Sequence, residues 1–231
     1  MAKRIGILGG VSAESTVEYY TRLIRGYFAR QGNDHYPEIV IYSLDFRHFT
    51  NFEDNGDRDG YIAYIMTGIR ALERAGAEFI LMSANSPHSV FEELETQAVV
   101  PMLSIVNATA EDAKRLGLKK LLLLGIKYTM QSTFYQKACR GMGIEIVTPV
   151  ESEQDEINGI IFEELARGIF RDETKQRLLQ IIAGYPVDGV ILGCTELPLI
   201  LKSNDATIPL LDTPELHTQA VLDYALAEAV E

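Results

Sequence analysis

The sequence has no tryptophan, two cysteines and four histidines among its 231 residues. Two cysteines do not indicate a disulfide framework, and no histidine pair has a spacing typical of a metal site. No apolar run reaches the roughly 18 residues of a membrane-spanning helix. The N-terminal residues lead directly into a strand-like segment, without the apolar region of a signal peptide. We therefore expect a cytoplasmic protein that binds no metal.

Positive charge is also scarce, with 21 Lys and Arg against 33 Asp and Glu and a net charge of −12. Binding to nucleic acid needs clustered Lys and Arg, and the sequence contains no such cluster. An acidic protein can still bind a small anion through a few local donors and helix N-termini. We expect a small-molecule partner, and neither nucleic acid nor a membrane.

Short apolar runs alternate with longer stretches of helical periodicity, a pattern that predicts a parallel α/β fold. The predicted strands are continuous apolar runs, as expected when helices cover both faces of a sheet. We expect strands at 4–8, 38–43, 78–83, 120–124, 187–192 and 208–211, with weaker ones near 100–102 and 144–147. We expect helices at 12–30, 60–75, 104–116, 129–141, 153–168, 171–184 and 213–229.

The chain contains a weak internal repeat. The segment 78–88 resembles 188–198 at an offset of 110 residues, so position 84 corresponds to position 194. The segment 4–9 resembles 120–125 at an offset of 116 residues, so position 9 corresponds to position 125. This repeat predicts two similar lobes with mainly parallel sheets, one formed by 1–98 plus 208–231 and the other by 99–207. Equivalent strand ends would approach a shared cleft. The repeat aligns Cys194 with Ala84, so one copy carries a thiol and the other a methyl group.

Cys194 directly follows a predicted buried strand, in the segment Gly193-Cys194-Thr195-Glu196. Strand ends followed by helix starts are where α/β proteins place their chemistry. A thiol at a helix N-terminus is acidified by the helix dipole, so we expect a thiolate at neutral pH. The alternative is a small buried residue at a packed strand end. Cys139 lies in a helical pattern, and we expect it to be structural.

Polar residues follow the other predicted strands as well. Gly10 and Ser12 come after the first strand, where a glycine turn and a helix start offer N–H groups to an anion; the alternative is a plain turn with Ser12 as N-cap. Asp45 and Arg47 come after the second, and Arg47 is a candidate for binding a carboxylate through both nitrogens. The alternative there is a surface loop with a solvated ion pair. His88 and His217 are candidates for a supporting role beside the site.

Together these segments resemble the aspartate/glutamate racemase family of cofactor-independent amino-acid racemases. The resemblance covers nearly the whole chain. It rests on the segments Gly9-Gly10-Val11-Ser12-Ala13-Glu14-Ser15-Thr16, Ser43-Leu44-Asp45-Phe46, Asn85-Ser86-Pro87-His88, Gly193-Cys194-Thr195-Glu196-Leu197-Pro198 and Asp212-Thr213-Pro214-Glu215-Leu216-His217.

The resemblance implies two lobes related by a pseudo-twofold axis, an active site in the cleft between them, a homodimer, and no pyridoxal phosphate, metal or nucleotide. It implies two bases on opposite faces of the α-carbon of an aspartate or glutamate substrate. The resemblance implies that Cys194 is one of these bases. The substrate carboxylate would be held by fixed donors from Asn85, Ser86 and Thr195. Asp45 and Glu196 are the candidates for binding the amine.

Ala84 departs from the family pattern, because many members have the first catalytic cysteine at this position. Members with threonine there prefer the L-enantiomer, and by analogy Cys194 would act on the L-face. A methyl group cannot transfer a proton, so a water molecule or Ser86 would have to protonate the opposite face. We therefore expect an L-preferring racemase. The alternatives are a single-cysteine decarboxylase or isomerase of a dicarboxylic acid, and a catalytically silent protein that binds amino acids or dicarboxylates.

Overall fold

The computed structural model describes residues 2–32 and 35–227. Within these residues the strands form two separate four-stranded sheets, and every strand pairing is parallel. No helix in the described ranges combines the length and apolar character needed to cross a bilayer. The strands are β1 Ile5–Gly9, β2 Ile39–Ser43, β3 Phe79–Met82, β4 Met102–Leu103, β5 Lys120–Leu124, β6 Glu145–Val147, β7 Gly189–Leu192 and β8 Leu210–Asp212.

Helices connect successive strands, as parallel pairing requires. The α-helices are α1 Ala13–Gln31, α2 Phe46–Asn55, α3 Arg58–Arg74, α4 Phe91–Gln97, α5 Ile105–Arg115, α6 Lys127–Gln131, α7 Phe134–Arg140, α8 Glu151–Gly159, α9 Asp172–Ala183, α10 Leu197–Ile200 and α11 Thr213–Leu226. Three other turns are a 3-10 helix η1 Ser86–Val90, a π-helical turn η2 Ile160–Glu164 and a 3-10 turn η3 Leu165–Arg167.

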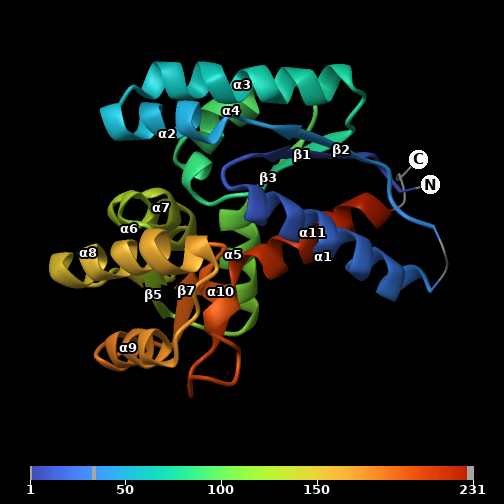
Figure 1. Cartoon of the computed structure of the whole chain (residues 1–231). Helices are drawn as coiled ribbons and strands as arrows, with labels where there is room; N and C mark the ends of the chain where they lie inside the picture. Colours follow the sequence, from blue (N-terminus) through green and yellow to red (C-terminus); the bar gives the residue numbers. More distant parts are fainter. Residues whose placement is uncertain (1, 33–34, 228–231) are drawn as a thin grey trace. The chain divides into compact units, whose positions relative to one another are not determined.

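The chain divides into two units. Unit 1 comprises Met1–Ile105 and His217–Glu231 and contains the sheet with strand order β2-β1-β3-β4. Within this unit, α2 and α3 lie on one side of the sheet, and α1 and α11 lie on the other (Figure 1). On the α3 side, Ile65, Ile69 and Leu72 pack with sheet residues Leu8 and Ile80 in a buried apolar core.

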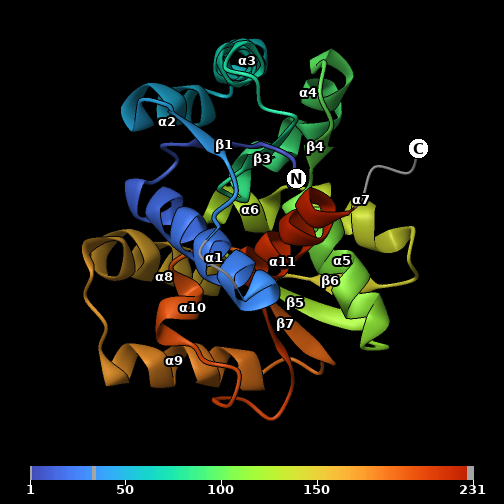
Figure 2. The same cartoon turned by 90° about the vertical axis from the view of Figure 1, so that its right-hand side faces the viewer.

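Unit 2 is the continuous segment Val106–Leu216, and its sheet has the order β6-β5-β7-β8. Figure 2 shows α5 on one side of β5 and β7, with α8 and α9 on the other. Ile157 of α8 and Leu178 of α9 pack against the buried strand residues Leu122 and Val190.

The two sheets have the same topology, which agrees with the repeat in the sequence. When the strands are numbered separately in each unit, both sheets have the strand order 2-1-3-4. In β3 and β7 the offset is 110, from Phe79 to Gly189. Ile5 pairs with Phe79 and Leu121 pairs with Gly189, which sets an offset of 116 between β1 and β5. The strand register thus reproduces both offsets found in the sequence, and Ala84 and Cys194 each lie two residues beyond the end of the third strand.

The limits of the two units differ from the predicted ones. The structure divides the chain after Ile105 and after Leu216, whereas the sequence placed the divisions at 98/99 and 207/208. β4 pairs with β3, so residues 102–103 belong to the first sheet. β8 pairs with β7, which places the strand predicted at 208–211 in the second sheet. Each unit needs its own fourth strand, and the predicted limits gave both to the wrong lobe.

All eight predicted strands are present within a few residues, and the differences concern helices. The helix predicted at 129–141 is broken because Ser132 has extended backbone angles between α6 and α7. The helix predicted at 153–168 begins at Glu151 and continues through η2 and η3 to Gly168, whose φ of 71° ends it. The helices α2, α4 and α10 and the turn η1 were not predicted. The last residues of the helix predicted at 213–229 lie outside the described residues.

Candidate active site

The candidate residues of unit 1 follow three adjacent parallel strands, so they lie at one edge of the sheet. Gly10 follows β1, Asp45 follows β2 and Ala84 follows β3. The loops are in direct contact: a Cβ on Gly10 would lie 2.2 Å from the carbonyl oxygen of Leu44. The hydroxyl of Ser15 donates to the carbonyl of Ser83. The structure therefore brings together the three unit 1 segments named from the sequence.

Gly10 and Ser12 shape the first of these loops. Gly10 has a φ of 85°, which favours glycine, and its N–H donates to the hydroxyl of Thr16 at 2.9 Å. The side chain of Ser12 caps α1 by accepting from the N–H of Ser15 at 3.1 Å. These polar groups hold the turn and the helix start. Binding of a substrate by Gly10 and Ser12 stays a prediction.

Asp45 and Arg47 belong to a helix start, where the sequence indicated only a loop. The carboxylate of Asp45 caps α2 and accepts from the N–H of His48 at 2.7 Å. Its own N–H donates to the hydroxyl of Tyr64 at 2.9 Å. Arg47 is in the first turn of α2, and its side chain is exposed. The guanidinium is thus carried by a capped helix at the same sheet edge as Ala84.

The turn after β3 is buried throughout. Ala84, Asn85 and Ser86 are 7%, 5% and 5% exposed. The ring of His88 holds this turn, since its Nε2 accepts the N–H of Ile105 at 3.2 Å and its Nδ1 therefore donates to the carbonyl of Ala84 at 3.0 Å. Burial, with a smaller contribution from His217, lowers the pKa of His88 to about 3. His88 is a neutral residue that fixes the backbone at position 84.

His217 makes a similar pair of bonds within unit 1. Its Nε2 donates to the carbonyl of Leu103 at 3.0 Å, and its Nδ1 accepts from the hydroxyl of Tyr19 at 3.0 Å. Burial lowers the pKa of His217 to about 4. The rings of His88 and His217 are in edge contact, with centroids 6.2 Å apart. These two histidines join the turn at Ala84 to the places where the chain leaves and re-enters unit 1.

Glu53 is a neighbour of the site that was not predicted from the sequence. Its carboxylate accepts from the hydroxyl of Tyr61 at 2.7 Å and also interacts with the side chain of Ser86. Burial raises the pKa of Glu53, and these two hydrogen bonds oppose that effect. The signal in the sequence was Asp45 followed by Gly56, an N-cap residue and a C-cap glycine that together mark a ten-residue helix carrying Glu53.

In unit 2, Cys194 forms a compact polar cluster with its neighbours. The thiol Sγ donates to Oε2 of Glu196 at 2.9 Å, and the hydroxyl of Thr195 donates to the same oxygen at 2.8 Å. Glu196 is 8% exposed, and Cys194 is half-buried. A buried carboxylate thus holds the proton of the only cysteine among the candidates.

This cluster reverses the expected effect on the thiol. Burial raises the pKa of Cys194 well above its ordinary value, and the negative charge of Glu196 raises it further. Backbone N–H groups of Thr195 and Glu196 lower it, as the sequence analysis expected, but by less. α10 spans only four residues, so its dipole is small. The expectation of a thiolate at neutral pH was therefore wrong, and the resting group is a thiol.

The backbone before Cys194 is fixed by two close contacts. The hydroxyl of Thr213 donates to the carbonyl of Leu192 at 2.9 Å, at the end of β7. A Cβ on Gly193 would lie 2.8 Å from the carbonyl oxygen of Leu124, so only glycine allows this approach of β5 and β7. The second cysteine, Cys139, is buried in α7, and burial raises its pKa to about 11. It is a free cysteine in the packed interior.

Comparison with known proteins assigns the chain to a family. The Asp/Glu/hydantoin racemase family matches residues 8–221. The broad specificity amino-acid racemase RacX of Bacillus subtilis is 28% identical over 229 residues, covering 96% of this chain and 98% of the relative.

Solved structures give the same result. An aspartate racemase homologue from Pyrococcus horikoshii is 40% identical with a TM-score of 0.87, over 98% of this chain and 100% of the other. The aspartate racemase of Picrophilus torridus is 26% identical with a TM-score of 0.76, over 96% and 94%. With two parallel sheets of equal topology and a strand-end Cys-Thr-Glu cluster, this chain belongs to the Asp/Glu/hydantoin racemase family.

Proposed function

We propose that this chain is a racemase of acidic amino acids that works without pyridoxal phosphate and uses Cys194 to remove the α-proton of the L-enantiomer. The observation that carries the proposal is the thiol–carboxylate pair of Cys194 and Glu196 in a member of a racemase family. Relatives described as aspartate racemase and glutamate racemase support an acidic substrate.

The pair supplies both a base and a place for the thiol proton. In the first step the thiol passes its proton to the carboxylate of Glu196, 2.9 Å away. The resulting thiolate takes the α-proton, and the electron pair of the broken C–H bond stays on the α-carbon and spreads into the substrate carboxylate. We propose that donors from Asn85, Ser86 and Thr195 stabilise that charge.

Arg47 would hold the side-chain carboxylate of the substrate. Because Glu196 already accepts two hydrogen bonds, Asp45 is the preferred partner for the substrate amine.

The L-preference follows from Ala84. At the position that the repeat equates with Cys194, this chain has a methyl group that transfers no proton. Protonation on that face is left to a water molecule or to the hydroxyl of Ser86, and an alcohol is a much weaker acid than a thiol. Exchange of the L-enantiomer should therefore be faster than formation or exchange of the D-enantiomer.

The test is exchange of the α-proton in heavy water, followed by NMR. Wild type should exchange L-aspartate or L-glutamate, and Cys194→Ala should lower the rate by at least about 100-fold. Cys139→Ala is the matched control and should keep the rate. RacX is described as having broad specificity, so a panel of other L-amino acids belongs in the same experiment. If the wild type exchanges none of them, the proposal fails.

A second candidate is favoured by the protonated state of the thiol. A decarboxylase of disubstituted malonates breaks a C–CO₂ bond, and the carbanion that remains takes one proton from one side. A resting thiol with a raised pKa is suited to that step, and Ala84 leaves it as the single thiol of the repeat pair. Release of CO₂ from such a malonate, without α-proton exchange of amino acids, would support this reading. If L-aspartate raises the melting temperature but the protein catalyses neither α-proton exchange nor decarboxylation, the protein is a catalytically silent binding protein.

A further inference from the structure

The turn after β3 contains a hydroxyl group in contact with a carboxylate. Ser86 is 5% exposed, and its side chain forms a hydrogen bond with the carboxylate of Glu53 in α2. The hydroxyl of Tyr61 in α3 donates to Oε1 of the same carboxylate at 2.7 Å. These side chains form one polar cluster within unit 1. The cluster reaches the turn two residues after Ala84, the position at which the repeat lacks a thiol.

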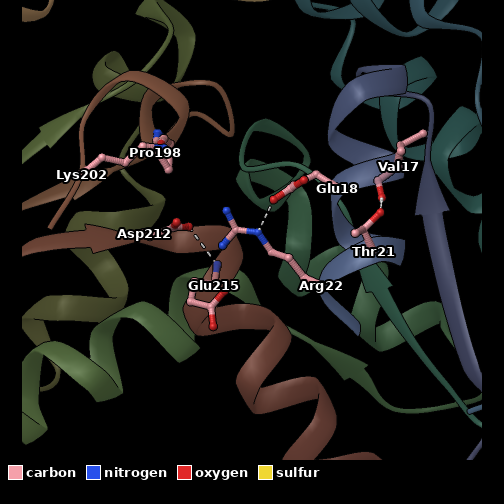
Figure 3. A network of polar contacts seen from close by, with 8 residues as sticks. All are labelled: Val17, Glu18, Thr21, Arg22, Pro198, Lys202, Asp212 and Glu215. Carbon is pink, nitrogen blue, oxygen red and sulfur yellow. Dashed lines mark hydrogen bonds and ion pairs between the residues drawn. The ribbon is translucent and has the colours of Figure 1, made fainter. Parts of the chain in front are cut away.

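The partners of Glu53 differ from those of acidic side chains elsewhere in the chain. Asp212 accepts from the backbone N–H of Glu215 at 2.9 Å, and Glu18 accepts from the guanidinium of Arg22 at 2.7 Å (Figure 3). Glu53 contacts two hydroxyls instead, and within the described residues no Lys or Arg side chain pairs with it. Burial is the largest influence on its pKa and raises it, so this carboxyl group holds a proton more readily than an exposed glutamate does.

The repeat gives this cluster a counterpart in unit 2. The offset of 110 residues that equates Ala84 with Cys194 also equates Ser86 with Glu196. In unit 2 the carboxylate belongs to the turn itself, and Glu196 accepts directly from the thiol of Cys194. In unit 1 the carboxylate comes from α2, and the hydroxyl of Ser86 connects it to the turn. Each turn therefore has a carboxylate bonded to a group that can transfer a proton.

Other polar side chains beside the turn are bonded to its backbone. The neutral ring of His88 donates from Nδ1 to the carbonyl of Ala84. The hydroxyl of Ser15 donates to the carbonyl of Ser83. These bonds hold the chain in place and connect to no carboxylate. Ser86 differs because its hydroxyl is bonded to a group that can replace a proton that it gives away.

We propose that Ser86 and Glu53 act together as a proton relay for the face of the α-carbon opposite Cys194, in place of the thiol that position 84 lacks. The proposal rests on the removal of the α-proton by Cys194 proposed above. The electron pair of the carbanion takes the hydroxyl proton of Ser86 and forms the new C–H bond. As that O–H bond breaks, the oxygen of Ser86 takes the carboxyl proton of Glu53, which is left as a carboxylate.

Solvent completes the cycle. A proton from water restores the carboxyl group of Glu53, and the proton taken up at Cys194 and Glu196 is released to water. The net reaction is inversion of the α-carbon, with no other bond made or broken. In heavy water the D-enantiomer that forms therefore carries deuterium.

The relay corrects the main weakness of an alcohol as a proton donor. A lone serine would be left as an alkoxide, which is a far stronger base than a carboxylate. With Glu53 behind it, Ser86 passes on the proton of a carboxylic acid, and the negative charge ends on the carboxylate. In the reverse direction that carboxylate is a weaker base than a thiolate, which agrees with slower reaction of the D-enantiomer.

The test measures how the carbanion divides between its two faces. L-aspartate and L-glutamate are incubated with the full chain in heavy water. The rate at which the D-enantiomer forms is divided by the rate of α-proton exchange in the L-enantiomer, with chiral chromatography for the first and NMR for the second. This ratio does not depend on how fast Cys194 forms the carbanion or on how much of the protein is folded. A purely structural defect lowers both rates and leaves the ratio unchanged.

Wild type should form the D-enantiomer at a measurable fraction of the exchange rate. Ser86→Ala and Glu53→Gln should each lower the ratio by at least about 100-fold, because each interrupts the relay. Ser86→Cys should keep the ratio at or above the wild-type value, since a thiol is a stronger acid than an alcohol. Glu95→Gln makes the same chemical change as Glu53→Gln at an exposed position of α4, and it should leave the ratio unchanged.

Two results would overturn the relay and leave proton removal by Cys194 in place. One is a Glu53→Gln variant with the wild-type ratio, and the other is a wild type that exchanges the L-enantiomer but forms no D-enantiomer. A wild type that exchanges neither amino acid would instead overturn the proposed function, and the relay with it.

Discussion

At the scale of the residue, Glu196 determines how Cys194 behaves. The half-buried thiol donates to a carboxylate oxygen 2.9 Å from Sγ, so moving the proton from one to the other leaves the net charge of the pair unchanged. The carboxylate keeps the thiol protonated at rest and can receive its proton when a substrate is bound. The raised pKa of the thiol and the basic role that we propose for it are therefore compatible, because the same carboxylate would account for both.

Glu196→Gln should lower the pKa of Cys194, because the charge and the hydrogen bond of the carboxylate both raise it. Alkylation of Cys194 by iodoacetamide should become faster at neutral pH, while α-proton exchange should fall by roughly 100-fold as the proton acceptor is lost. Mass spectrometry across a pH series measures the first effect. Thr195→Val removes the other bond to Glu196 but keeps its charge, so the thiol should stay unreactive. An unchanged alkylation profile in Glu196→Gln would show that the thiol proton is not held there.

The sequence supplied the identity of this site but not its protonation state. Gly193-Cys194-Thr195-Glu196 marked a strand end with a reactive group, and that position is confirmed. A helix N-terminus after Cys194 predicts a thiolate through its backbone N–H groups, but the carboxylate of Glu196, two residues along, has the larger and opposite effect on the thiol pKa. Whether the carboxylate of Glu196 points toward Cys194 depends on side-chain packing, which the spacing of residues in the sequence does not predict.

At the scale of the element, two buried histidines hold the ends of unit 1 together. His88 joins the turn at Ala84 to Ile105, and His217 joins Leu103 to Tyr19. Both are neutral in the fold, with pKa values of about 3 and about 4. The sequence identified both residues near the site. Ala84 is four residues from His88, but the other three partners are 17 to 198 residues away, so those three bonds were not predictable.

Acid should destabilise the protein through these histidines. The unfolded chain takes up a proton at each near pH 6.5, but the fold does not until about pH 4 for His217 and about pH 3 for His88. The unfolded state therefore binds more protons as pH falls from about 6.5 to about 4, and each histidine lowers the free energy of unfolding by roughly 1.4 kcal/mol per pH unit.

Urea unfolding at several pH values in this window measures the effect. His217→Gln should reduce the loss of stability per pH unit, and His35→Asn, at an exposed position, should not. If the slope is the same in His217→Gln and wild type, His217 is not neutral in the fold.

At the scale of the whole molecule, the repeat is the main organising feature. Alternating apolar runs predicted all eight strands, because buried parallel strands have a strong and simple pattern. α10 has only four residues and is too short to show helical periodicity, and α2 was missed although Asp45 and Gly56 mark its ends. The limits of the units were displaced because β4 and β8 have only two and three residues, and their sheet partners are set by tertiary packing.

The equivalence of Ala84 and Cys194 has its own test. Ala84→Cys should raise α-proton exchange of the D-enantiomer by at least about 100-fold, since it supplies a thiol at the repeat position. Ala84→Ser adds a group of similar size that is a poor base, so it should leave D-exchange near the wild-type level. A folded Ala84→Cys protein without D-exchange would mean that position 84 does not face the substrate.

The order of segments along the chain also sets an order of completion during synthesis. Unit 2 is continuous, so it has all its strands once residue 216 has left the ribosome. Unit 1 lacks α11 until residues 213–226 have been made, and with it His217 and the bond from the N–H of Lys3 to the carbonyl of Ala225. A nascent chain that stops after unit 2 therefore has α1 on this side of the first sheet but lacks the cover that α11 provides.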